Sequence, residues 1–209
     1  MEYFAAPGAC SFGGHVVIRE LGLSIPVRLV GLGEAAETIR RINPLGRVPA
    51  LLLDDGSLLT ESTAILPFLA DLSPGTSLFA LSGTIERAQI QSWIGYVNSE
   101  VHAASVRAIN RPHLYSADTR AHEGIREAGL ERLRASFAPL DRHLSDKEFL
   151  VGDRFTIADA YVGLFAAYAS KFAEALTGFD ALVRYSDRYE KRPSVQAARS
   201  FEQEFEVAA

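Results

Sequence analysis

The chain carries a single cysteine, Cys10, within the stretch APGACSFGGH. It follows an apolar run, Glu2–Ala6, that predicts a strand, and precedes Ser11–Leu21, which predicts a helix closed by Gly22. A thiol at the N-terminus of a helix lies near the positive end of the helix dipole, which favours the thiolate and lowers the pKa. Because a lone cysteine cannot form an internal disulfide, any thiol chemistry here requires an external thiol.

A buried structural cysteine is the alternative interpretation of Cys10, and without context the two have about equal weight. The neighbouring pairs Pro7-Gly8 and Gly13-Gly14 predict an exposed turn and an open first helical turn, which favours the reactive interpretation. Ser11 could donate a hydrogen bond to the thiol, although capping the helix is the more common role for such a serine. His15, one turn further along, is interpreted as a packed or surface histidine.

The stretch GRVPALLL, Gly46–Leu53, is a second candidate for chemistry. The residue before a proline is pushed toward extended geometry, and Pro49 stands at the start of a predicted strand. If the Val48-Pro49 bond is cis, the Val48 backbone groups turn outward, where an extended peptide could pair with them. A trans bond is the more frequent form, since about 5–6 % of X-Pro bonds are cis, but the order of the elements favours the cis form here.

The stretch TESTAIL, Thr60–Leu66, places Glu61 and Ser62 where a strand enters a helix. The free N–H groups and the Ser62 hydroxyl suit a carboxylate, and Glu61 suits an ammonium group. Together they could hold the α-amino-acid end of a ligand. An ordinary helix cap with an acid in the first turn is the simpler alternative.

His102, in SEVHAAS, lies on a long predicted helix and could polarise a thiol or a leaving group. A solvated histidine on the helix surface is the alternative. Metal binding is poorly supported, because the histidines show no pair at helical spacing and no HExxH motif. The stretch GACSFGG lacks the lysine and the spacing of a phosphate-binding loop.

The elements that would position these residues follow a clear order in the first eighty residues. After the first strand and helix come a strand at Pro26–Leu32, a helix at Ala35–Ile42, a hairpin around Asp55-Gly56 and a helix at Thr60–Leu72. The order β-α-β-α-β-β-α lets the first two strands pair in parallel across a helix, while the last two form a hairpin. This is the order of the thioredoxin-like fold.

Strand signals end after Ser73–Gly83, a stretch rich in Gly, Ser and Pro that predicts a linker. The remainder is predicted to be helical, and TIAD matches the pattern of a capping box. We therefore expect an α/β thioredoxin-like domain, residues 1–79, followed by an all-α domain, residues 84–209. The predicted helices are Thr84–Ala108, Ala117–Leu144, Thr156–Phe172, Asp180–Lys191 and Ser194–Phe205.

The composition is ordinary for a soluble globular protein. The chain has 209 residues, 48 % hydrophobic and 22 % charged, with a formal net charge of −5, so we expect no nucleic-acid partner. Apolar runs are too short for a membrane span, the N-terminus lacks a basic signal region, and one cysteine suits a reducing compartment. We expect a cytoplasmic protein.

Taken together, APGACS, NPLGRVPAL, LTESTAIL with FLADL, SEVH and FTIADAY resemble a glutathione S-transferase of the bacterial beta class along nearly the whole chain. The pairing of Cys10 with His102 points to that class. The resemblance implies a glutathione site on the first domain and a pocket for a small apolar electrophile on the helical domain. Glutathione would be the co-substrate, no metal would be needed, and the protein would be a homodimer.

The resemblance also implies residue roles. Cys10 and His102 would lie beside the glutathione sulfur, with Ser11 as a further candidate for activating it. Val48, before a cis Pro49, would pair with the cysteinyl backbone, and Glu61 and Ser62 would bind the γ-glutamyl end. Ser99 and Glu100 would act across the dimer interface.

Several positions depart from the pattern of the class. Ala5 stands in place of a tyrosine, Gly95 in place of an asparagine and Ala103 in place of a basic residue. A lysine before the second helix is missing, which leaves Arg40, Arg41 or Arg47 to meet the glycine carboxylate. Two other functions therefore stay open: thiol-disulfide exchange through a Cys10 mixed disulfide, and a non-catalytic scaffold that binds a protein partner. Arg107–Arg120 is expected to form a mobile lip over the pocket.

Overall fold

The computed structural model describes residues 1–76, 78–170, 172 and 175–208. Its first part follows the predicted order of strands and helices, with a short 3-10 turn, Gly33–Ala35, before the second helix. The elements are β1 (Glu2–Ala5), α1 (Phe12–Glu20), β2 (Val27–Leu29), α2 (Glu37–Ile42), β3 (Ala50–Leu52), β4 (Leu58–Thr60) and α3 (Ser62–Asp71).

The strands form a four-stranded sheet in the order β2-β1-β3-β4. β1 and β2 pair in parallel, whereas β3 is antiparallel to both β1 and β4. The predicted hairpin is confirmed: Gly56 turns the chain at φ 83°, and the Ser57 N–H donates to the Asp55 carboxylate at 2.9 Å. A positive φ of this kind is one that glycine adopts without a steric penalty.

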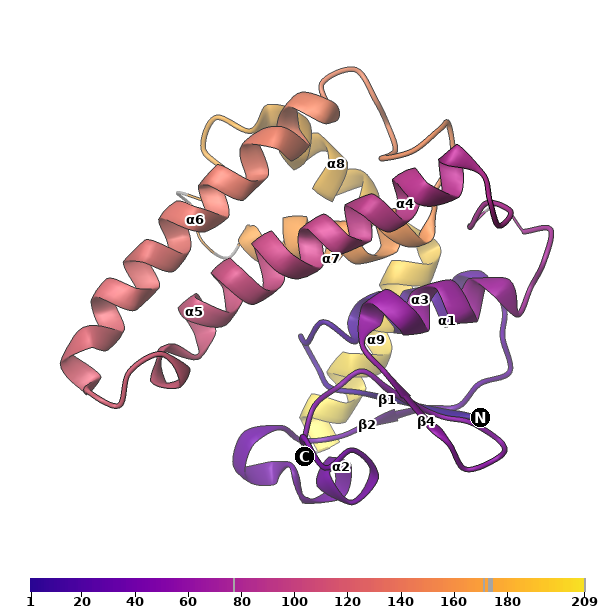
Figure 1. Cartoon of the computed structure of the whole chain (residues 1–209), viewed down its shortest axis with the longest axis horizontal. Helices are drawn as coiled ribbons and strands as arrows, with labels where there is room; N and C mark the ends of the chain where they lie inside the picture. Colours follow the sequence, from indigo (N-terminus) through magenta and orange to yellow (C-terminus); the bar gives the residue numbers. More distant parts are fainter. Residues whose placement is uncertain (77, 171, 173–174, 209) are drawn as a thin grey trace.

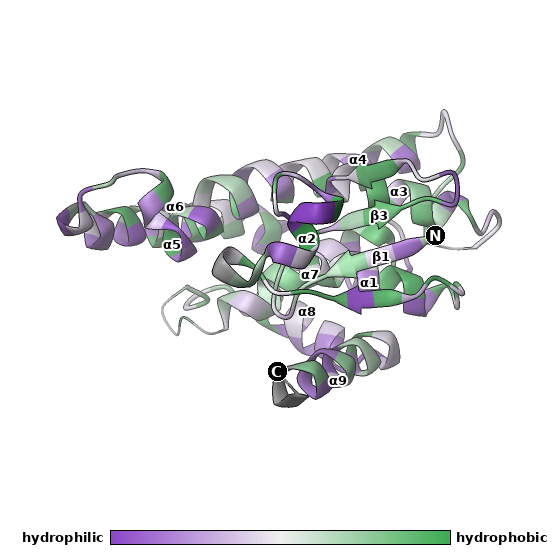
Figure 2. Cartoon of the chain, turned by 90° about the horizontal axis from the view of Figure 1, so that it is seen from below, coloured by the Kyte–Doolittle hydropathy of each residue, from purple (hydrophilic) through white to green (hydrophobic). Residues whose placement is uncertain are grey.

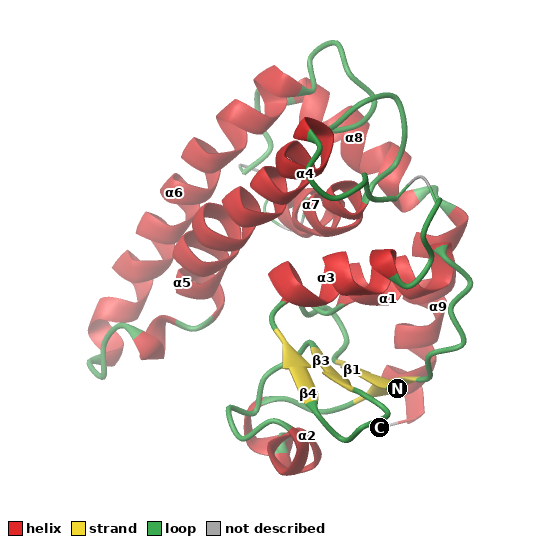
Figure 3. Cartoon of the chain, turned by 45° about the vertical axis from the view of Figure 1, so that its right-hand side comes forward, coloured by secondary structure: helices red, strands yellow, loops and turns green. Residues whose placement is uncertain are grey.

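Both faces of the sheet are covered, by α1 and α3 on one side and by α2 on the other (Figure 3). The alternation of side chains along β1 explains this arrangement, since neighbouring residues of a strand point to opposite faces. Tyr3 and Ala5 join the larger core beneath α1 and α3, while Phe4 and Ala6 pack with Ile39 of α2. The sheet is therefore covered on both sides, and the loops at its strand ends carry Cys10, Val48 and Glu61.

The second part consists of helices among its described residues. The elements are α4 (Ile85–Tyr96), a π-helical stretch (Val97–Val106), α5 (Arg107–Asn110), α6 (His122–His143), α7 (Ile157–Ala169), α8 (Asp180–Glu190) and α9 (Pro193–Ala208). The predicted linker Ser73–Gly83 and the predicted helix Thr156–Phe172 include positions 77 and 171, which lie outside the described residues.

The predicted helix Thr84–Ala108 extends to Asn110, and the ten residues Val97–Val106 within it are π-helical. α4, the π-helical stretch and α5 form one continuous rod beside α6 (Figure 1). The predicted start of α6 at Ala117 is wrong: a 3-10 turn, Thr119–Ala121, precedes a helix that begins at His122. Asp118 caps that turn through its carboxylate, which accepts the Arg120 N–H at 3.0 Å.

α7 lies at the centre of the helical domain and is buried along most of its length. The predicted capping box at its start is confirmed: Asp159 accepts hydrogen bonds from the Thr156 N–H and hydroxyl at 2.9 and 2.8 Å. The same carboxylate accepts from the Leu150 N–H and the Tyr185 hydroxyl, both at 3.0 Å. One buried acid thus ties the start of α7 to the preceding loop and to α8.

α9 returns to the first domain and packs against α1 (Figure 1). Arg192 and Glu20 pair at this junction, with the Arg192 Nε donating to the carboxylate at 2.9 Å, and Phe201 meets the ring of His15 edge-on. Hydrophilic and hydrophobic residues share the surface of α9, as expected for a helix with one buried side (Figure 2). The domain boundary between residues 79 and 84 stays a prediction. In the described part of the chain, no helix is long and apolar enough to span a membrane.

Candidate functional site

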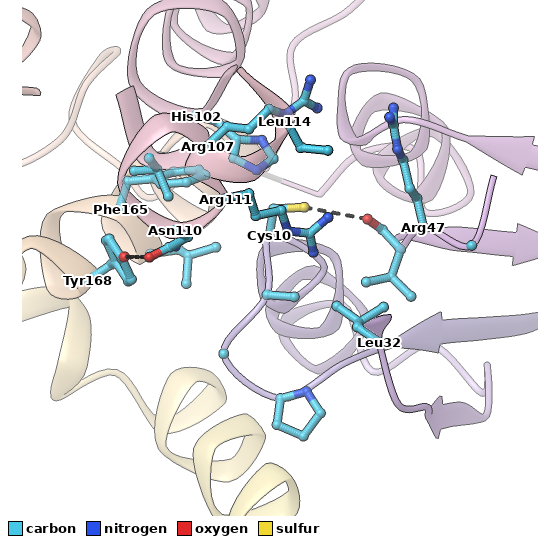
Figure 4. Close-up of a pocket in the computed structure, with 17 residues that line it drawn as sticks. Cys10, Leu32, Arg47, His102, Arg107, Asn110, Arg111, Leu114, Phe165 and Tyr168 are labelled. Carbon is cyan, nitrogen blue, oxygen red and sulfur yellow. Dashed lines mark hydrogen bonds between the residues drawn. The ribbon is translucent and has the colours of Figure 1, made fainter. Parts of the chain in front are cut away.

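A cavity of about 270 Å³ lies between the two parts of the chain (Figure 4). One wall comes from the loop after β1 and from the loops that flank α2, and the other from the π-helical stretch, α5 and α7. The first wall consists of Pro7, Gly8, Ala9, Cys10, Leu32, Gly46, Arg47 and Val48. The second consists of His102, Val106, Arg107, Asn110, Arg111, Leu114, Leu164, Phe165 and Tyr168.

Cys10 lies on the first wall as a half-buried free thiol, and its Sγ donates a hydrogen bond to the Val48 carbonyl at 3.5 Å. The prediction of a lowered thiol pKa is wrong. Burial, followed by the negative charge of Glu61, raises the pKa of Cys10 to about 11, and the positive charges of Arg111 and Arg107 offset only part of this. At neutral pH, Cys10 is a protonated thiol that can donate a hydrogen bond.

The structure does not bring Ser11 into the cavity. Ser11 is fully buried, and its hydroxyl accepts a hydrogen bond from the Ala6 N–H at 3.1 Å while its carbonyl accepts from Tyr3 at 2.7 Å. It therefore stabilises the turn that presents Cys10, and it makes no side-chain cap on α1. The predicted open first turn is also wrong, because Gly13 and Gly14 are buried and leave room for Tyr161 and Tyr3.

Of the two alternatives for His15, packed or on the surface, the structure shows the packed one. It is fully buried between α1 and α9, and its Nε2 accepts a hydrogen bond from the Arg19 Nε at 2.8 Å. Burial, assisted by the charge of Arg19, lowers the pKa of His15 to about 4. It does not line the cavity that holds Cys10.

The Val48-Pro49 bond is cis, as predicted. The Val48 carbonyl faces Cys10, and its N–H makes no hydrogen bond with any residue the structure describes. Of the three arginines considered for a ligand carboxylate, Arg41 pairs with Glu37, and Arg40 donates to the Gly33 carbonyl at 2.9 Å. Arg47 is the one that lines the cavity.

Glu61 and Ser62 lie where β4 meets α3, as predicted, but neither lines the cavity itself. Glu61 is exposed and has a strained backbone, with φ 70° and ψ 127°, which a side chain other than glycine rarely adopts. Ser62 is buried close to Tyr161, where it counteracts part of the rise in the Tyr161 pKa, and the Tyr161 hydroxyl donates to Asn98 at 3.0 Å. Glu61 is close enough to Cys10 to influence the pKa of its thiol.

His102 projects into the cavity from the π-helical stretch and stacks at a tilt on Phe165, with ring centroids 5.2 Å apart (Figure 4). Burial, together with the charges of Arg107 and Arg111, lowers the pKa of His102 to about 4, so the imidazole is neutral near pH 7. Ser99 and Glu100 lie on the same stretch but are exposed and do not line the cavity. π-Helical turns are frequent at functional sites because they reorient side chains within a helix.

Sequence reasoning missed most of the second wall. Arg107, Asn110, Arg111 and Leu114 fall in the segment expected to form a lip, but no role was predicted for them individually. The i, i+4 spacing of Arg107 and Arg111 could have identified a cationic face. Phe165 and Tyr168 lie in a helix apolar enough that no pattern separates cavity-lining positions from core positions.

No group of histidine, cysteine or acidic side chains suited to a metal ion occurs among the residues that the structure describes.

Comparisons with known proteins cover both halves of the chain. Residues 9–72 match the model of the glutathione S-transferase N-terminal domain, and residues 97–193 match that of the C-terminal domain. Glutathione S-transferase GstA of Escherichia coli O157:H7 is 34 % identical over 97 % of this chain and 98 % of its own. Glutathione S-transferase GST-4.5 of Xanthomonas campestris is 33 % identical over 95 % of this chain and 97 % of its own.

Solved structures agree with these relatives. A bacterial beta class glutathione S-transferase from Sphingomonas chungbukensis has a TM-score of 0.85 at 32 % identity, covering 97 % of this chain and 98 % of its own. A glutathione S-transferase from Xylella fastidiosa reaches 0.87 at 30 % identity over the same shares. This near-complete coverage argues for an enzyme rather than a non-catalytic scaffold. The chain belongs to the glutathione S-transferase family, and it is similar to that family's bacterial members.

Proposed function

We propose that this enzyme joins the sulfur of reduced glutathione to small hydrophobic electrophiles in the cavity between its two domains. The observation that carries the proposal is the different chemistry of the two walls. The first wall offers a cation at Arg47 and backbone hydrogen-bonding groups at Val48 beside the Cys10 thiol. The second offers apolar surface from residues such as Leu114 and Phe165 around a neutral imidazole. A polar peptide and an apolar partner would thus meet at Cys10 and His102.

The first wall suits an extended tripeptide. The Val48 N–H is available for pairing with a peptide backbone, and Arg47 can bind a terminal carboxylate. We propose that Glu61 and Ser62 hold the γ-glutamyl end. The N–H groups at the start of α3 and the Ser62 hydroxyl would bind its carboxylate, and Glu61 would bind its ammonium group. The related sphingomonad enzyme, 31 % identical with a TM-score of 0.84, was solved in complex with glutathione, which supports glutathione as the ligand.

The partner subunit would complete the site. Ser99 and Glu100 are exposed on the π-helical stretch, outside the cavity of their own chain. In the proposed homodimer they would reach the glutathione bound by the other subunit. This role stays a prediction for both residues.

Activation of the glutathione thiol would depend on the positive charges that line the cavity. Arg107 and Arg111 act electrostatically on both Cys10 and His102, and the same field favours a glutathione thiolate placed between them. The Cys10 thiol can donate a hydrogen bond to that thiolate. His102 has too low a pKa to retain a proton at neutral pH, so we expect it to orient the sulfur by a hydrogen bond, with the proton passing to solvent.

The experiment that tests this proposal is a calorimetric titration with reduced glutathione, followed by a conjugation assay with chlorodinitrobenzene. Arg47→Ala should weaken glutathione binding by about tenfold, the loss expected for one charge-assisted hydrogen bond. Arg41→Ala is the matched control, because Arg41 is an exposed arginine already paired with Glu37, and it should bind as the wild type does. No saturable binding of millimolar glutathione by the wild type would overturn the proposal.

Thiol-disulfide exchange is a second candidate, favoured by the position of the Cys10 sulfur in the cavity. Exchange requires Cys10 as the attacking thiolate, whereas conjugation uses the thiolate of glutathione. Cys10→Ser should therefore abolish disulfide reduction if exchange is the function, and it should leave most conjugation activity if our proposal holds. The raised pKa of Cys10 counts against exchange near pH 7.

A further inference from the structure

Two arginines lie on the second wall of the cavity, opposite the wall assigned to glutathione. Arg107 begins α5, and Arg111 caps the C-terminal end of this helix four residues later. Both line the cavity, and Figure 4 shows Arg111 reaching toward Cys10 while Arg107 lies beside His102. Both positive charges act on the Cys10 thiol.

Neither arginine has an ion-pair partner among the residues that the structure describes. Other arginines of the helical domain do: Arg87 pairs with Asp71, and Arg199 pairs with Glu190. Like charges four residues apart on a helix repel each other. A pair kept in this position without a carboxylate of its own is therefore suited to an anion from outside the chain.

The surroundings indicate what kind of anion would fit. Leu114 supplies exposed apolar surface suited to a flat ring, and Phe165, whose ring contacts His102, lines the same cavity. Asn110 lies between the arginines in sequence, and its side-chain Oδ1 accepts a hydrogen bond from the Tyr168 hydroxyl at 2.6 Å. That bond orients the Asn110 amide so that its NH₂ group is left to donate to a ligand. The wall thus combines an apolar surface with cationic and amide donors.

In the proposed function this cationic face acts on the glutathione sulfur only through its electric field, because Arg47 on the opposite wall would meet the glycine carboxylate of glutathione. We propose that Arg107 and Arg111 form a carboxylate-binding subsite, and that the preferred electrophiles are aromatic molecules that carry a carboxylate. This inference rests on the proposed function and specifies its substrate class. The carboxylate would lie against the arginines, and the ring would lie against Phe165.

Chlorodinitrobenzoate and its neutral carboxamide are the probes that test this subsite. In either reaction the glutathione sulfur forms a bond to the ring carbon that carries chlorine, the C–Cl bond breaks, and chloride leaves with the electron pair. The thiol proton passes to solvent. Because the two probes differ in charge at a site remote from the reacting carbon, the ratio of their kcat/KM values, corrected by their uncatalysed rates, measures recognition of the carboxylate.

We expect the wild type to prefer the carboxylate by about tenfold, the value of one charge-assisted hydrogen bond. Arg107→Met and Arg111→Met should each lower this ratio severalfold, and the double variant should bring it close to one. Arg111→Lys keeps the charge and should retain most of the preference. Arg126→Ala removes an exposed arginine of α6 outside the cavity, and it should behave as the wild type.

A wild-type ratio near one, with the carboxamide turned over, would overturn the subsite while leaving conjugation intact. An equal loss of kcat/KM for both probes together with weaker glutathione binding in the double variant would assign the arginines to glutathione instead. Calorimetry with the two preformed glutathione conjugates distinguishes failure of the subsite from failure of the proposed function. If neither conjugate binds, the proposed function fails and the subsite fails with it, whereas tighter binding of the carboxylate conjugate supports both.

Discussion

At the scale of single residues, Cys10 combines accessibility with a raised pKa. Its sulfur lines the cavity, yet its pKa of about 11 leaves very little thiolate near neutral pH. Because the thiolate is the form that alkylates, the rate of reaction with iodoacetamide should rise about tenfold per pH unit from about pH 7 to about pH 10. The measurement is simple, since the chain has one cysteine and mass spectrometry counts one label. A plateau of the rate near pH 8 to 9, as for an ordinary thiol, would contradict this prediction.

Glu61 is the residue where stability and binding conflict. Its backbone, at φ 70°, is strained for any residue with a side chain. Glu61→Gly should raise the free energy of unfolding by about 1 kcal/mol by removing this strain, and it should weaken glutathione binding because the carboxylate is lost. Glu61→Ala is the matched control, which loses the carboxylate and keeps the strain. Thermal unfolding and calorimetric titration of both variants separate the two effects; an equal stability of the two would show that the strain has no energetic weight.

The site could be predicted from sequence where local rules fix it. Cys10, Val48 and Glu61 stand next to turns and strand ends that short patterns identify, and the structure places them there. The pKa of Cys10 could not be predicted, because it depends on burial and on Glu61, which is fifty-one positions away in the chain. The dipole argument considered only the nearest helix. Burial in the folded protein and the charge of Glu61 outweigh the effect of that helix on the Cys10 pKa.

At the scale of elements, glycines set how closely the helices pack. Gly163 of α7 faces Tyr189 of α8, and a Cβ built at Gly163 would lie 2.2 Å from the tyrosine ring. Gly163→Ala should lower the free energy of unfolding by about 2 kcal/mol through overpacking. Gly95 of α4 is exposed and has no atom within 4 Å of an added Cβ, so Gly95→Ala should raise stability by up to about 1 kcal/mol. Urea denaturation of both variants measures these opposite shifts, and a destabilised Gly95→Ala would refute the helix-propensity argument.

Helix order was predictable, but the conformation within the long rod was not. The pattern from Thr84 indicated one helix, and nothing in it marked the change to π-helix at Val97. Within that stretch, the Ser105 hydroxyl donates to the carbonyl of Glu100, five residues earlier, at 2.7 Å. The π-helical stretch also packs against α6 and α7, and the local sequence pattern carries no information about these tertiary contacts. Such packing determines the direction of His102 and therefore the composition of the second wall.

At the scale of the whole molecule, His15 makes stability depend on pH. It is buried between α1 and α9, and its pKa falls from 6.5 to about 4 in the fold. Because the unfolded chain binds the proton more strongly, the contribution is complete above pH 6.5 and is lost as the pH falls toward 4. The loss amounts to at most about 3 kcal/mol. His15→Phe keeps a ring against Phe201 and cannot titrate.

Thermal unfolding between pH 7 and about pH 4.5 checks this expectation, since most of the His15 contribution is lost within that window. The wild-type Tm should fall more steeply than that of His15→Phe. The control is His113→Phe, which changes an exposed histidine and should follow the wild type. Parallel curves for the wild type and His15→Phe would mean that His15 is protonated without cost in the folded protein.

The Gly8 N–H donates to the Glu202 carboxylate of α9 at 3.0 Å, across 194 positions of sequence. Gly8 is part of the cavity wall next to Cys10. α9 therefore helps to hold the loop that carries Gly8 and Cys10, although this helix does not line the cavity itself. A substitution that removes the Glu202 carboxylate would take away this hydrogen bond, so a helix outside the cavity bears on the shape of its wall.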